Sequence, residues 1–220
     1  MTAQQLPQTA GFHQLTLPPN QERFTLSLPT DYQSQNQYPL VLTLHWGGPV
    51  TPYYGASILQ SLLEPALRSL NAIFVAPDCT YTDWRTPQSE THLINLLDYI
   101  ESHYPINPQQ RVVTGYSKGG LGSWYMAARH QDYFAAALPL AAQPLADSLT
   151  TDWQIPLFLI NARQDEIFPV ERTITAVQTL QNAGTDIHLT LLDHITHYQT
   201  DKFVKPLATA VPWLQQRWTR

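Results

Sequence analysis

The stretch that decides the fold runs from Arg111 to Trp124 and reads RVVTGYSKGGLGSW. Its first residues are apolar and β-branched and predict a buried strand, and the residues after Gly119 predict a helix. Between them, Gly115 to Gly119 spell G-x-S-x-G, the pattern of a sharp turn that lifts a serine hydroxyl above the end of a strand. The glycines are expected because a side chain there would collide where strand and helix cross. The stretch therefore predicts Ser117 as a nucleophile.

Apolar runs alternate with helix-period segments along the rest of the chain, and this alternation predicts an α/β fold. The expected architecture is a mostly parallel sheet with helices on both faces. Further strands are expected at residues 22–29, 39–44, 71–76, 135–141, 156–160 and 187–192. Helices are expected from Pro87 behind a Thr86 cap, from Val170 to Gly184, and over residues 202–218 with interruptions at Pro206 and Pro212.

Length and composition limit the classes of protein to consider. A chain of 220 residues fits one domain, 1–220, with residues 1–20 as an extended N-terminal arm. A hydrophobic fraction of 43% favours a folded chain, and a net charge of −5 without a basic run gives no reason to bind nucleic acid. Cys79 is the only cysteine, so an internal disulfide is excluded. With no recognisable signal peptide or membrane span, we expect a cytoplasmic location.

A serine nucleophile needs a histidine to take its proton and a carboxylate to orient that histidine. In a site built on such a serine turn, called a nucleophile elbow, the serine comes first along the chain. The acid and then the base follow, each on a loop after a later strand. Asp165 follows the strand at 156–160, and His197 follows the strand at 187–192. Asp165 could instead cap the helix behind it, and His194 is the rival base. The weaker rivals for the acid are Glu166, Asp147 and Asp152.

The negative charge that develops on the reacting carbonyl oxygen needs backbone N–H donors. One donor is expected at Lys118, directly after the serine, and the other in the loop His45-Trp46-Gly47-Gly48 after the strand at 39–44. Within that loop either Gly47 or Trp46 could supply the amide. An ordinary Gly-Gly turn is the alternative interpretation.

The segment between the expected strands at 135–141 and 156–160 decides how much apolar surface can cover the site. Residues 142–155 read AQPLADSLTTDWQI, enough for a loop and one helical turn, so we expect a minimal cap or none. Each buried CH₂ of a substrate contributes about 0.8 kcal/mol, and an uncovered site gains little from a long chain. Trp46, Tyr116 and Trp84 are expected as pocket walls, although Tyr116 and Trp84 could equally be core residues.

With these residues placed, the chain resembles the phospholipase/carboxylesterase and dienelactone-hydrolase-like branch of the α/β-hydrolases. The resemblance covers residues 38–213 and rests on LTLHWGG, VAPDC, VVTGYSKGGLGSWYMAARH, FAAALPLAA, NARQDEIFP and the later histidine. It implies Ser117, Asp165 and His197 as the triad, with Gly47 and Lys118 as oxyanion donors. Two residues depart from the family: Trp46 stands where many relatives have glycine, and Lys118 where many have Met or Gln.

The sequence thus predicts a serine esterase that cleaves small, short-acyl carboxylic esters through an acyl-enzyme. Thioester or peptide hydrolysis by the same triad is the alternative enzyme function, since serine acylation does not depend on the acyl donor. A catalytically silent hydrolase fold acting as a binding protein is the alternative from another class. No cofactor is expected, and no metal, because no pair of histidines shares helical spacing with a carboxylate. The sequence does not indicate an oligomeric state.

Overall fold

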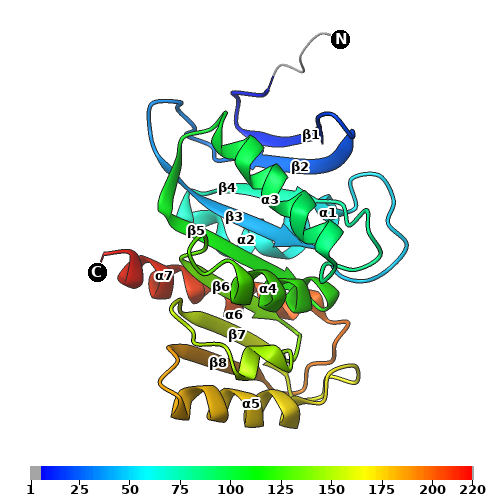
Figure 1. Cartoon of the computed structure of the whole chain (residues 1–220), viewed down its shortest axis with the longest axis vertical. Helices are drawn as coiled ribbons and strands as arrows, with labels where there is room; N and C mark the ends of the chain where they lie inside the picture. The colour runs from blue at the N-terminus through cyan, green and yellow to red at the C-terminus, as the bar shows by residue number, and fades with distance from the viewer. Residues whose placement is uncertain (1–5, 220) are drawn as a thin grey trace.

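The computed structural model of the chain describes residues 6–219, and its centre is an eight-stranded sheet (Figure 1). The strands are β1 (Gly11–Leu17), β2 (Glu22–Leu28), β3 (Tyr38–Leu44), β4 (Ile73–Pro77), β5 (Ile106–Tyr116), β6 (Ala136–Leu140), β7 (Leu157–Ala162) and β8 (Ile187–Leu192). Their order across the sheet is β1-β2-β4-β3-β5-β6-β7-β8. The pairs β1–β2 and β2–β4 are antiparallel, and the other neighbours are parallel. The expected mostly parallel sheet is confirmed.

Parallel pairing determines where a site can form. Because β3 to β8 run in one direction, their carboxyl ends share one edge of the sheet, on the right in Figure 1. Four segments follow those ends: the oxyanion loop (residues 45–48), Ser117, the acid loop (residues 163–169) and the base loop (residues 193–199). The residues that the sequence selected for chemistry therefore lie at one edge.

The helices cover both faces of the sheet. They are α1 (Gly55–Ile58), η1 (Leu59–Leu63), α2 (Glu64–Leu67), η2 (Arg68–Leu70), α3 (Pro87–Glu101), α4 (Lys118–Arg129), η3 (Asp147–Leu149), α5 (Val170–Asn182), η4 (Thr200–Phe203), α6 (Val204–Ala208) and α7 (Ala210–Trp218). One buried cluster joins the sheet to α3, α4 and α5, and a second joins it to the segment from α1 to η2 and to α6 and α7. Two apolar cores, one on each face, hold the layers together.

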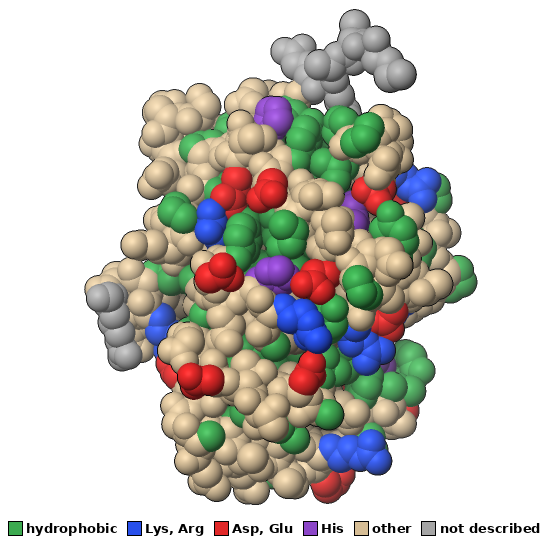
Figure 2. Space-filling view, in the orientation of Figure 1, with side chains coloured by type: hydrophobic (Ala, Val, Ile, Leu, Met, Phe, Trp, Pro, Cys, Tyr) green, Lys and Arg blue, Asp and Glu red, His purple; other side chains and the backbone are tan. Residues whose placement is uncertain are grey.

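The cap over the site is small, as the sequence predicts. Between β6 and β7 the only helical element is η3, a single 3-10 turn. On the face shown in Figure 2, acidic and basic side chains are interspersed and form no continuous basic area. Within residues 6–219 no helix is long and apolar enough to cross a bilayer.

The structure differs from the sequence predictions at three places. Residues 11–17, expected within an extended arm, form β1, since pairing along β2 satisfies a segment whose own alternation is weak; residues 1–5 of that arm lie outside the described residues. The helical segment from α1 to η2 was not predicted, although its elements follow one another without a gap and bury Leu59, Leu63 and Leu67 against the sheet. The helix expected over 202–218 is divided into η4, α6 and α7, as its two prolines predict, but Pro206 and Pro212 lie inside α6 and α7 and the break falls at Thr209.

Candidate active site

Ser117 lies in the tight turn between β5 and α4, with backbone angles φ +57° and ψ −117°. Few non-glycine residues adopt a positive φ, and such strain persists only where the surroundings enforce it. Its N–H donates to the Leu140 carbonyl at 2.9 Å. A Cβ added to Gly119 would stand 1.9 Å from the Leu44 carbonyl oxygen, and one added to Gly115 would stand 2.5 Å from the Gly119 carbonyl oxygen. The predicted steric need for both glycines is confirmed.

The structure brings Ser117, His197 and Asp165 together. His197 Nε2 lies 2.8 Å from Ser117 Oγ, and His197 Nδ1 lies 2.8 Å from Asp165 Oδ2. The Asp165 side chain is fully buried, and its Oδ1 accepts the N–H groups of Ile167 at 2.9 Å and Phe168 at 2.7 Å. One carboxylate therefore orders its own loop before α5 and also contacts the histidine.

The rival residues are placed elsewhere. His194 is exposed at φ +58°, and no hydrogen bond joins it to Ser117 among the described residues. Asp147 forms an ion pair with Arg129 at 3.3 Å on the segment between β6 and β7. Glu166 does reach the site, but at another atom: its Oε2 accepts the backbone N–H of His197 at 2.9 Å.

The oxyanion loop is held by the imidazole of His45, which is buried. The N–H of Cys79 donates to His45 Nε2 at 2.9 Å, so Nδ1 carries the proton and donates to the Trp46 carbonyl at 2.7 Å. Burial lowers the pKa of His45, which favours this neutral form. A peptide group points its C=O and N–H to opposite sides, so the Gly47 N–H faces away from the ring.

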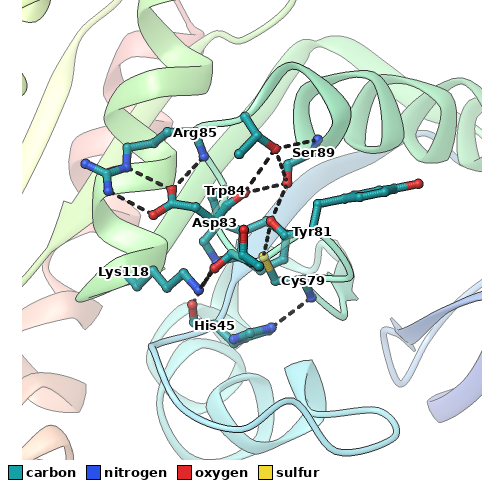
Figure 3. Close-up of polar contacts among 10 residues, drawn as sticks. His45, Cys79, Tyr81, Asp83, Trp84, Arg85, Ser89 and Lys118 are labelled. Carbon is teal, nitrogen blue, oxygen red and sulfur yellow. Dashed lines mark hydrogen bonds and ion pairs between the residues drawn. The ribbon is translucent and has the colours of Figure 1, made fainter.

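A further loop, here called the support loop (residues 79–86), contacts both His45, at the start of the oxyanion loop, and the side chain of Lys118 (Figure 3). The Trp84 indole N–H donates to the His45 carbonyl at 2.9 Å, and the Lys118 ammonium donates to the Thr82 carbonyl. A Cβ added to Gly47 would lie 3.8 Å from Cδ of Lys118, so the Lys118 stem runs past the oxyanion loop. The sequence predicted Trp84 as a pocket wall and Thr86 as a helix cap, but not that this loop contacts the oxyanion side of the site.

A pocket of about 480 Å³ opens in front of Ser117 and His197. Its lining residues are Trp46, Gly47, Tyr116, Ser117, Ile167, His197, Tyr198 and Thr200. Trp46 and Tyr116 are therefore wall residues, as expected. Trp84 is not one of them, because its side chain is fully buried behind His45, in agreement with the alternative interpretation as core.

Ile167, Tyr198 and Thr200 were missed as wall residues. Tyr198 is 72% exposed and Ile167 is 46% exposed, so the mouth of the pocket is apolar and open. Their positions could have suggested this, since Tyr198 directly follows the histidine and Ile167 follows Asp165 by two residues. Among the described residues, no group of three or more His, Cys, Asp or Glu side chains is placed to hold a metal ion.

This fold, with a serine elbow at the carboxyl edge of a parallel sheet, defines the class as α/β-hydrolase. More particularly, the chain belongs to the Esterase family, described as "Putative esterase", whose family model matches residues 18–213.

Curated relatives include fungal esterases. The chain is 26% identical over 173 residues to "Probable feruloyl esterase C" of Aspergillus niger, covering 73% of this chain and 60% of that protein. It is 25% identical over 195 residues to "Feruloyl esterase C" of Emericella nidulans, covering 81% of this chain and 68% of that protein. The chain thus spans about three fifths of the length of the Aspergillus niger relative.

Solved structures share the fold at low identity. Fluorophosphonate-binding serine hydrolase F of Staphylococcus aureus has a TM-score of 0.73 at 14% identity, covering 94% of this chain and 98% of that chain. A thermostable esterase has a TM-score of 0.71 at 21% identity, covering 93% of this chain and 60% of that chain. At such identities the likeness concerns the fold alone.

Proposed function

We propose that this chain is a serine carboxylic-ester hydrolase that works through an acyl-enzyme. The observation that carries the proposal is the chain of contacts from Ser117 Oγ through His197 to Asp165 at the floor of an open pocket. Family membership and relatives named as feruloyl esterases support it.

In the proposed reaction, His197 Nε2 takes the proton of Ser117 Oγ as Oγ bonds to the ester carbonyl carbon. The carbonyl C–O bond to the alcohol breaks when His197 returns the proton to the leaving oxygen, which frees the alcohol and leaves an ester on Ser117. Water repeats the sequence and releases the acid. Asp165 keeps the proton of the neutral imidazole on Nδ1 and stabilises the imidazolium that forms.

The oxyanion formed in each half-reaction would be bound by the N–H groups of Gly47 and Lys118. Two observations support Gly47 as the loop donor: the His45 bond to the Trp46 carbonyl turns the Gly47 N–H away from the ring, and Gly47, which has no side chain, lines the pocket with its backbone. Lys118 is the first residue of α4, where the helix dipole adds positive potential.

The substrate we propose is a small ester with a short acyl group, since a single 3-10 turn stands where a large cap would enclose a long chain. A compact aromatic acyl group is the second candidate. It is favoured by the aromatic side chains of Trp46, Tyr116 and Tyr198 in the pocket wall, and by the names of the fungal relatives.

Labelling with a fluorophosphonate tests the proposal without assuming a substrate. Wild-type protein should be labelled and Ser117→Ala should not, with ester turnover reduced by about 10⁴-fold or more. Labelling of a folded Ser117→Ala protein would show that the nucleophile lies elsewhere.

Two ester series then separate the substrate candidates. With p-nitrophenyl esters, kcat/KM should be highest from acetate to butyrate and fall clearly by octanoate. Methyl esters of hydroxycinnamates test the aromatic acyl group. A preference for palmitate would contradict both candidates.

A further inference from the structure

The backbone of His197, like its ring, is held by hydrogen bonds from side chains. Its N–H donates to Glu166 Oε2 at 2.9 Å, and its carbonyl accepts the hydroxyl of Tyr116 at 2.7 Å. Together with the ring contacts to Asp165 and Ser117, these bonds engage all four polar groups of the residue. The proposed base therefore has two backbone contacts, to Glu166 and to Tyr116, in addition to the contacts of its ring with Asp165 and Ser117.

We propose that Glu166 is a positioning residue that holds the backbone of His197, with Tyr116 as its counterpart on the carbonyl side. The inference rests on the proposed function of Ser117 and His197. The consecutive carboxylates Asp165 and Glu166 have separate roles, because the first contacts the ring of His197 and the second contacts its main chain.

The surroundings of His197 explain why such bonds are needed. The base loop contains no helix or strand, and His194 within it has a positive φ of 58°. Within the loop, the Gln199 side chain accepts the Thr196 N–H at 2.8 Å, and the Gln199 N–H donates to the Thr196 carbonyl at 3.4 Å. These bonds close a turn around His197 but do not engage its own N–H or carbonyl. A loop without a regular hydrogen-bond ladder relies on side chains for its position, and a displacement of about 1 Å at a reacting group can cost about 100-fold in rate.

Tyr116 is suited to its part because it remains a hydrogen-bond donor. Burial raises the pKa of its hydroxyl, and the charges of Asp165 and Glu166 raise it further, so the proton stays on the oxygen. Its ring lies 5.5 Å from the His197 ring and 5.0 Å from that of Phe203, measured between centroids. The same side chain thus donates to the His197 carbonyl and packs beside the imidazole.

Glu166→Ala and Glu166→Gln are the test variants, and Glu171→Ala is the matched control. Glu171 is an exposed glutamate in the first turn of α5, five positions along the chain. For Glu166→Ala we expect kcat to fall about tenfold with KM within about twofold, since the base and not the pocket is displaced. Gln keeps an oxygen that accepts the His197 N–H, so Glu166→Gln should recover kcat to within about threefold of wild type.

Tyr116→Phe supplies a second measurement, because it removes only the hydroxyl. It should lower kcat by several-fold, and the double variant with Glu166→Ala should depart from the product of the single effects, since both bonds hold one residue. Wild-type kcat in Glu166→Ala, an equal loss in Glu171→Ala, or no recovery with Gln would overturn the inference. Failure of the proposed function looks different: the wild-type protein itself would then not be labelled by a fluorophosphonate at Ser117.

Discussion

The two sides of the site are held in different ways. On the base side, formed by the acid and base loops, the carboxylates of Asp165 and Glu166 contact His197 directly. On the oxyanion side, formed by the oxyanion and support loops, the neutral ring of His45 and the ammonium of Lys118 bind backbone carbonyls. The proposed base is thus held by charged side chains that contact it directly. The amides proposed to bind the oxyanion are held only through neighbouring groups, the Trp46 carbonyl and the Lys118 side chain. The contrast predicts large losses on the base side and graded losses on the oxyanion side.

The largest effect should come from the base itself. His197→Ala should reduce kcat/KM about 10⁴-fold or more, because His197 Nε2 stands 2.8 Å from Ser117 Oγ and no other side chain within residues 6–219 hydrogen-bonds to that oxygen. His194→Ala should stay within about threefold of wild type, since that exposed ring does not contact Ser117. Steady-state kinetics on a p-nitrophenyl ester measure both. A larger loss in His194→Ala than in His197→Ala would contradict the comparison, because the base would then be His194.

A smaller loss is expected at His45, on the oxyanion side. His45→Ala removes the donor to the Trp46 carbonyl and leaves the Cys79 N–H without its acceptor. We expect kcat to fall about 10- to 100-fold, approaching the cost of losing one oxyanion donor, with KM changed little. The surface histidine His103 is the control position. Wild-type kcat in His45→Ala would mean that the ring does not determine the direction of the Gly47 amide.

Lys118 should give a loss of only a few-fold. Lys118→Met keeps a straight stem beside Gly47 and removes the bond to the Thr82 carbonyl, while the backbone N–H of residue 118 is retained. A two- to fivefold fall in kcat is therefore expected, roughly the effect of one exposed hydrogen bond. Measuring kcat of Lys118→Met and Lys118→Ala separates the contribution of the ammonium from that of the stem, since only Ala also removes the stem. A loss as large as that of His45→Ala would place the ammonium in the reaction itself.

The smallest effect concerns stability and pH. Burial lowers the pKa of His45 in the folded chain, so below the ordinary value of about 6.5 the unfolded chain binds more protons than the folded one. The contribution of His45 is full above that pH and is lost as the pH falls towards the folded pKa. Thermal melts at about pH 7.5 and about pH 5.5 should show a larger drop in Tm for wild type than for His45→Asn. An equal drop in both proteins would contradict this account.

Sequence reasoning was strongest where local chemistry is specific. The succession of strands along the chain from β2 to β8 followed from apolar runs, and the serine turn followed from Gly115 and Gly119, whose close contacts admit no side chain. The convergence of Asp165 and His197 on Ser117 followed from parallel topology, because each comes directly after a strand whose carboxyl end lies at the same edge.

What the sequence could not predict depends on contacts between distant residues. β1 exists through its pairing with β2, and Trp84 is buried because it reaches the His45 carbonyl 39 positions away. The bond from Glu166 to the His197 backbone likewise spans 31 positions and leaves no periodic pattern. Side chains that support a backbone at long range carry no spacing rule, so only the folded chain reveals them.

The position of β8 has a consequence for how the molecule loses activity. Ser117 follows β5, which lies between β3 and β6, whereas the base loop follows β8, an edge strand whose residues after Ile187 are half-buried or exposed. Edge elements with few buried contacts open locally at lower free energy than central ones. In mild denaturant we expect the base loop to detach first, so that inactivation precedes the loss of tryptophan fluorescence. Amide hydrogen exchange should then be fast along β8 while β5 remains protected.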